Sequence, residues 1–145
     1  MKNRSCFATI VGLAFVLSGF AAAPDKIDQL TGLPVYPGTY MSQALPRGTF
    51  CKSTTQTVMY MVAEVKVDAV LQWYTTRLKD FPKYHSHADN RSQDTFFKPD
   101  GTVAVTATGV PDNSGDLFAI SFVRLQPPFT KRQMETFNQD KPSCN

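Results

Sequence analysis

The sequence predicts a two-layer α+β domain in which a mostly antiparallel sheet is covered by one long helix. Segments 56–65, 102–108 and 117–125 alternate apolar and polar residues, as half-buried strands do. Segment 67–81 instead repeats apolar residues at helical spacing. Proline, glycine, asparagine and aspartate separate these segments. The predicted order is therefore β-α-β-β-β followed by a short C-terminal helix.

Residues 1–23 have the three-part pattern of a secretory signal peptide. Lys2 and Arg4 precede the apolar run 7–20, and three alanines follow it. A spanning helix needs about 20 apolar residues, so the alternative of a membrane anchor is disfavoured. We expect cleavage after Ala23, or one or two residues earlier, and a periplasmic or secreted location. The remaining chain, residues 24–145, is expected to form a single globular domain.

Removal of residues 1–23 changes the charge and the cysteine count. The formal charge falls from +3 to +1, because Lys2 and Arg4 are lost with no acid, and Cys6 is lost too. A charge of +1 offers no footprint for a polyanion, so no nucleic-acid partner is expected. No later apolar run is long enough to span a membrane. Cys51 and Cys144 remain, and in an exported chain they predict one disulfide, the alternatives being free thiols or an intermolecular bridge.

The first half of the domain leads from an extended segment into a strand and a helix. Residues 24–54 are rich in proline and glycine and are expected to be extended, as in 33–38 (LPVYPG). Strand 56–65 is partly apolar on both faces, which favours a place inside the sheet. The helix is expected over 67–81, and Pro82 ends it. Its stripe consists of Val67, Val70, Leu71, Tyr74, Leu78 and Phe81.

The second half is predicted to be a meander. Residues 94–98 run into a Pro-Asp-Gly turn, and residues 111–116 (PDNSGD) form a second turn between strands 102–108 and 117–125. Thr130 and Gln133 match a capping box before a short helix over 131–138. Strand order stays open, and one parallel pair can arise because a helix connects the first strand to the rest.

Two of these features carry a resemblance to a group of known proteins. The LPVYPG segment at 33–38 precedes a helix with the pattern Val70-x-x-x-Tyr74-x-x-x-Leu78. This combination resembles small exported or lipid-anchored α+β domains of bacterial envelopes, many of which have no assigned function. The resemblance covers about the first half of the exported chain and implies no catalytic residue.

The concentrated set of metal-ligand residue types is His85, His87 and Asp89. If residues 84–89 are extended, the period of two places both imidazoles and the carboxylate on one face, which suits zinc or copper. The alternative is an exposed polar loop. No G-x-S-x-G elbow or phosphate-binding glycine motif is present, so we expect neither an enzyme nor a cofactor.

Aromatic residues suggest partner binding instead. Tyr36 and Tyr40 lie in the proline- and glycine-rich segment, and consecutive Phe96 and Phe97 must point to opposite faces of a strand. Exposed aromatics on rigid loops are typical anchors of an interface. The leading hypothesis is an exported, non-enzymatic binding module for a protein or cell-envelope partner, with an inhibitor or immunity protein as one version. The alternatives are a periplasmic small-ligand or metal-binding protein using His85, His87 and Asp89, and a structural subunit of an envelope assembly.

Overall fold

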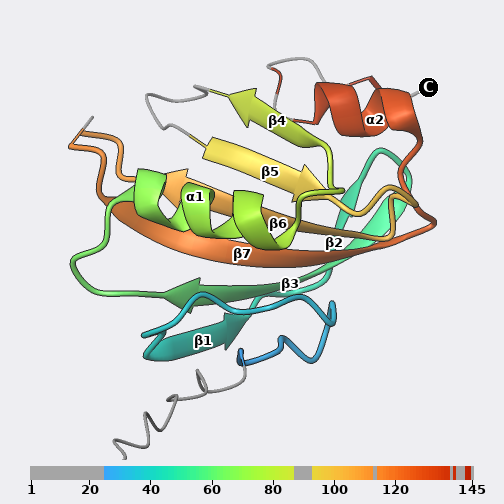
Figure 1. Ribbon diagram of the computed structural model, residues 1–145. Helices are drawn as coiled ribbons and strands as arrows, with labels where there is room; N and C mark the ends of the chain where they lie inside the picture. The colour runs from blue at the N-terminus through green and yellow to red at the C-terminus, as the bar shows by residue number, and fades with distance from the viewer. Residues whose placement is uncertain (1–24, 87–92, 113, 138, 140–142, 145) are drawn as a thin grey trace, which may run out of the picture.

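The structure, a computed structural model, describes residues 25–86, 93–112, 114–137, 139, 143 and 144. The predicted signal peptide lies outside the described residues. In the part described, a sheet carries helix α1 on one face and helix α2 against the other, near one end (Figure 1).

The sheet has seven strands, and every pairing among them is antiparallel. Its order is β1-β3-β7-β6-β5-β4, with β2 also paired to β3. After β3 the chain passes through α1 to β4 at the far edge and then returns as a meander to β7 beside β3. No parallel pair forms between these strands. The strands are β1 (Met41–Ala44), β2 (Gly48–Phe50), β3 (Ser53–Met61), β4 (Lys83–Ser86), β5 (Gln93–Phe97), β6 (Val103–Gly109) and β7 (Leu117–Gln126).

Helix α1 (Val67–Arg77) is shorter than the predicted helix over 67–81. The backbone leaves helical geometry at Leu78, whose N–H still donates to the Tyr74 carbonyl at 2.7 Å. Pro82 disfavours helical geometry at Phe81, the residue before it, so the helix does not reach the predicted end at Phe81. The prediction of one long covering helix is therefore not confirmed. The cover is shared with Leu33 and Val35 of the N-terminal segment, which are buried in the same core.

The larger core lies between α1 and the sheet. Val70 and Tyr74 of α1 pack with Ile120 and Phe122 of β7, and all four side chains are fully buried. The Tyr74 hydroxyl also donates to the Pro34 carbonyl at 3.1 Å, which fixes the N-terminal segment against the helix. Burial raises the pKa of Tyr74 far above its usual range.

A buried carboxylate holds the beginning of the described chain against β3. Asp28 accepts hydrogen bonds from the Tyr60 hydroxyl at 2.7 Å and from the backbone and side chain of Thr31 at 2.8 and 2.7 Å. Burial, together with this bond to Asp28, raises the pKa of Tyr60 to about 12. The segment 25–35 is thus tied to the sheet by specific polar contacts as well as by apolar packing.

The smaller core lies under α2 (Lys131–Thr136), on the opposite face. The predicted capping box is confirmed: the Gln133 N–H donates to Thr130 Oγ1, and the Thr130 N–H donates to Gln133 Oε1. The helix is two residues shorter than the predicted 131–138. Its buried partners on the sheet are Phe97, Ala104 and Leu125.

Candidate functional site

An exposed edge of the sheet is formed by β1. All four β1 residues are exposed, and β1 pairs only with β3 among the described strands. Tyr40, directly before it, is 63% exposed, and Met41 is 49% exposed. Large apolar side chains at such exposure leave apolar area in contact with water, which a partner can cover.

Two further methionines extend this surface. Met61 lies directly opposite Met41 in the β1–β3 register, and Met59 lies opposite Gln43. Cross-strand partners point to the same face, so Met41, Met59 and Met61 share the face that does not carry α1. Met59 and Met61 are partly exposed. We call Tyr40, Met41, Met59 and Met61 the β1 edge surface.

The structure separates the four predicted aromatic anchors. Tyr40 is exposed, whereas Tyr36 is partly buried with its ring centroid 5.4 Å from that of Trp73. Phe96 and Phe97 are 2% and 0% exposed. They do point to opposite faces, but each face is covered there, Phe96 belonging to the α1 core and Phe97 to the α2 core. Both phenylalanines are therefore core residues with no surface to offer a partner.

The methionines of the β1 edge surface did not enter the sequence-based hypothesis. Their alternation on strand 56–65 was visible in the sequence, and the strand does lie inside the sheet, between β1 and β7. Because both faces of the strand are partly apolar, the pattern did not show which face would be exposed. The short strand β1 has no apolar alternation, so nothing marked it as the neighbour of β3.

Of the predicted metal ligands, the structure describes only His85, because His87 and Asp89 lie outside the described residues. His85 is on β4, and its Nδ1 contacts the carboxylate of Asp94, its cross-strand partner on β5. Asp94 is buried and also lies 3.4 Å from Lys83 Nζ. The described residues contain no group of three or more histidine, cysteine or acidic side chains placed to hold a metal. Asp94 was not predicted as a site residue, because its contact with His85 depends on the β4–β5 register.

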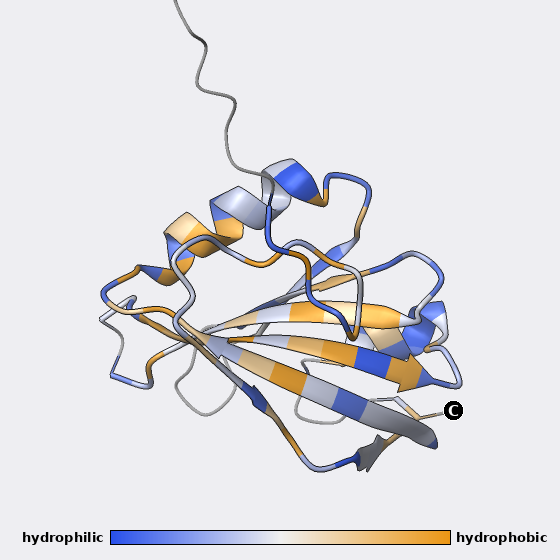
Figure 2. Cartoon of the chain, turned by 90° about the horizontal axis from the view of Figure 1, so that it is seen from below, coloured by the Kyte–Doolittle hydropathy of each residue, from blue (hydrophilic) through white to orange (hydrophobic). Residues whose placement is uncertain are grey.

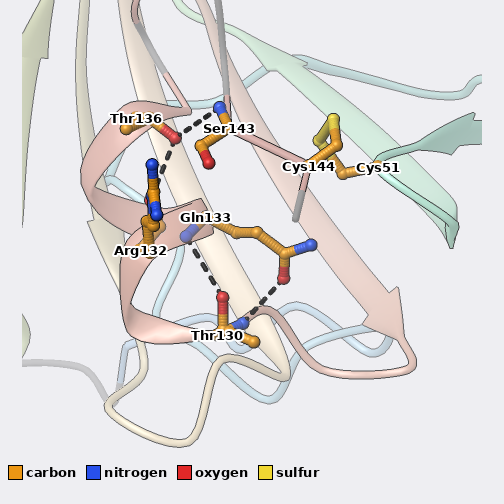
Figure 3. The surroundings of a disulfide bond; sticks show 7 residues. All are labelled: Cys51, Thr130, Arg132, Gln133, Thr136, Ser143 and Cys144. Atoms are coloured by element: carbon orange, nitrogen blue, oxygen red, sulfur yellow. Dashed lines mark hydrogen bonds between the residues drawn. A yellow bond between two sulfur atoms is a disulfide. The ribbon is translucent and has the colours of Figure 1, made fainter.

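The predicted disulfide between Cys51 and Cys144 is confirmed (Figure 3). Cys51 is in the turn between β2 and β3, so the bridge ties this hairpin to the C-terminal tail. The tail is also held by α2, because the Ser143 N–H donates to Thr136 Oγ1 at 2.8 Å. Disulfides are typical of proteins in oxidising compartments, which agrees with export.

Within the described ranges, no helix is long and apolar enough to cross a membrane. Comparison of the chain with protein-family models, with curated proteins and with solved structures finds no match.

Proposed function

We propose that this chain is an exported, non-enzymatic binding module whose protein or cell-envelope partner docks on the β1 edge surface. The single observation that supports this role is the exposed strand β1, which begins with the exposed Met41 and directly follows the exposed Tyr40. An open edge strand can pair with a strand of another protein, while neighbouring side chains select the partner. Methionine suits such a surface because its flexible thioether adapts to the shape that it meets.

The disulfide supports the same role. It joins positions 93 residues apart and ties the turn of the β2–β3 hairpin to the C-terminal tail. A domain that is rigid before binding loses less conformational entropy when it binds. An inhibitor or immunity protein that acts on a secreted hydrolase or toxin is one form of such a module, and a structural envelope subunit is another.

Photo-crosslinking tests the proposed docking surface. We would place p-benzoylphenylalanine at Met41 or, as a matched control, at Phe118, which is 40% exposed on β7. Each variant is irradiated in envelope extract of the organism that makes the chain. We expect one predominant adduct from position 41 that is absent from position 118. The same adducts from both positions, or none from position 41, would contradict docking at β1.

Export is tested separately from docking. The full chain is produced in a bacterium, and the periplasmic or secreted fraction is analysed by N-terminal sequencing. The proposal predicts a first residue at Pro24, or one or two residues earlier. A Leu13→Arg, Val16→Arg variant, which interrupts the apolar run, should remain unprocessed in the cell. Equal processing of both chains would count against a signal peptide.

A second candidate function is metal binding at His85, and the contact between His85 and Asp94 favours it. A carboxylate that accepts a hydrogen bond from one imidazole nitrogen orients the ring and makes the other nitrogen a better metal ligand. Calorimetry with zinc and copper should give weaker binding in His85→Ala and His87→Ala than in the parent. Identical weak binding in all three proteins would reject the site.

A further inference from the structure

The sheet face that α1 covers extends past the helix, and a polar hollow lies on this uncovered part. Its volume is about 200 Å³, and its lining residues are Arg47, Thr54, Gln56, Arg124 and Gln126. Gln56 lies directly opposite Arg124 in the β3–β7 register. Alternation along β3 places Gln56 on the same face as Tyr60, which is in the α1 core. Figure 2 shows hydrophilic bands side by side on β3 and β7 toward this end of the sheet.

Every side chain that lines the hollow can donate hydrogen bonds, and two of them carry a positive charge. No carboxylate lines the hollow, and neither guanidinium forms an ion pair with an acid of the described chain. Arg77, by contrast, pairs with Asp25 at 2.9 Å. Two guanidinium groups on one hollow repel each other, and an anion between them removes that cost.

Gln56 orders one of the two arginines. With its amide oxygen facing Arg47, it accepts hydrogen bonds from Arg47 Nη2 at 3.0 Å and Nε at 3.1 Å. The other guanidinium N–H groups of Arg47 and the amide N–H groups of Gln56 can still donate. Arginine presents its donors as a planar fork that matches the oxygens of a carboxylate or a phosphate.

An apolar hollow continues from the polar one. It has a volume of about 250 Å³ and shares Arg47 and Gln56 as a wall, while Leu30, Ala44, Leu45 and Val58 supply its apolar lining. A third hollow of about 480 Å³ shares Leu30, Ala44 and Val58 and extends the groove to Asp28 and Tyr60. A ligand with its charge at the arginines can therefore place an apolar tail along β3.

We propose that this groove binds a small amphiphilic anion, with its carboxylate or phosphate between Arg47 and Arg124 and its apolar tail against Leu45 and Val58. This site goes beyond the proposed docking of a partner, and it lies on the other face of the sheet from Met41, Met59 and Met61. The two sites can therefore be tested independently.

Calorimetry with four soluble probes tests the site on the exported chain. Octanoate and octyl phosphate carry both head and tail, octanol carries only the tail, and inorganic phosphate carries only the head. We expect binding of octanoate or octyl phosphate, and whichever binds more tightly identifies the head group. Octanol and inorganic phosphate should each bind at least about tenfold more weakly, because each omits half of the contacts.

Variants assign the binding to the groove. Arg47→Gln and Arg124→Gln should each weaken binding of the amphiphile about tenfold or more. Added salt should weaken binding to the parent more than binding to the variant that carries both substitutions. Leu45→Asn should weaken octyl phosphate and leave inorganic phosphate unchanged. Arg132→Gln, on α2, is the matched control and should have no effect. Arginines 47, 124 and 132 are all exposed, so the unfolding midpoints should not move.

Several results would overturn the proposal: no binding of either anionic amphiphile, equal binding of octanol, equal binding of inorganic phosphate, or equal affinity in the Arg47 and Arg124 variants. A failed docking experiment at β1 would leave this site intact, because the calorimetry uses no partner protein.

Discussion

Strands β3 and β7 present two different surfaces along a single face of the sheet. Under α1, the cross-strand partners Tyr60 and Ile120 are buried. Four residues along each strand, the partners Gln56 and Arg124 line an open hollow. Val58 and Phe122 are the partners between these two pairs, so the change from apolar to cationic takes a few residues. The polar residues begin where the helix cover ends. The open end is thus a polar surface suited to contact with water, unlike an apolar core that lacks a cover.

Truncation in the covered half should have the largest effect on stability. Phe122→Ala removes a fully buried ring from the α1 core and should lower the free energy of unfolding by about 3–5 kcal/mol. Arg124→Ala, two residues away on the same face, should change it by no more than about 0.5 kcal/mol. Urea unfolding of both variants measures the contrast. Comparable losses would mean that the open end is part of the core.

The disulfide should have the next largest effect, on the opposite face. A Cys51→Ser, Cys144→Ser variant of the exported chain should lose about 2–5 kcal/mol, because the bridge limits the unfolded chain and holds the tail beside α2. Thermal unfolding with and without reductant provides the measurement. The parent should lose stability on reduction, and the variant should not respond. A variant as stable as the oxidised parent would show that α2 needs no covalent tie.

The polar tie between Asp28 and Tyr60 should contribute less. Tyr60→Phe leaves the buried carboxylate with one hydrogen bond fewer and should cost about 1–3 kcal/mol. Tyr40→Phe is the matched control, since that exposed hydroxyl has no such role. Equal unfolding midpoints in the two variants would mean that Asp28 does not depend on Tyr60.

The same tyrosine predicts a loss of stability in alkali. The pKa of Tyr60 is raised from 10.0 to about 12 in the folded chain, so the unfolded chain releases its proton first. The free energy of unfolding should therefore be constant up to about pH 9 and decrease as the pH rises through 10 to 12. The decrease should be shallower in Tyr60→Phe, and Tyr74 and Tyr84, whose pKa values burial also raises, should contribute to the rest. A flat profile above pH 10 would contradict this burial of the phenol groups.

The smallest effect concerns the turn between β2 and β3. Cys51 and Lys52 have φ values of 48° and 68°, as a two-residue hairpin turn requires, but neither is glycine or asparagine. Lys52→Gly should stabilise the chain by about 0.5–1 kcal/mol, because the backbone is then unstrained. Lys52→Ala should bring no such gain. A loss of stability in Lys52→Gly alone would show that the lysine side chain has a role of its own.

Local sequence patterns predicted the elements whose stability is local. The alternation of β3, β6 and β7 and the capping box of Thr130 and Gln133 were visible because each depends on a few consecutive residues. Strands β1, β2 and β4 were not predicted, since they are short and owe their existence to a neighbour rather than to their own pattern. The end of α1 at Arg77 was missed because the stripe continues through Leu78 and Phe81, which stay near the core after the helix ends.

The candidate sites depend more strongly on long-range pairing. Arg47 and Arg124 are far apart in the sequence. Arg47 reaches the hollow through the pairing of β1 and β2 with β3, and Arg124 reaches it through the pairing of β3 with β7. The contact of Asp94 with His85 likewise needs the β4–β5 register. Tyr40 was predicted correctly as an exposed residue, whereas Phe96 and Phe97 were misplaced because the cover on the second face comes from α2, about thirty residues later in the chain.

The claim that the open end of this face is a binding site is tested most directly by a nuclear magnetic resonance titration of the parent chain with octyl phosphate. The account predicts saturable shifts of the Arg47 and Arg124 side-chain N–H signals, together with the methyl signals of Leu45 and Val58. The methyl signals of Met41, Met59 and Met61 should stay in place. Shifts confined to the methionines, or no saturable shift at either arginine, would contradict it.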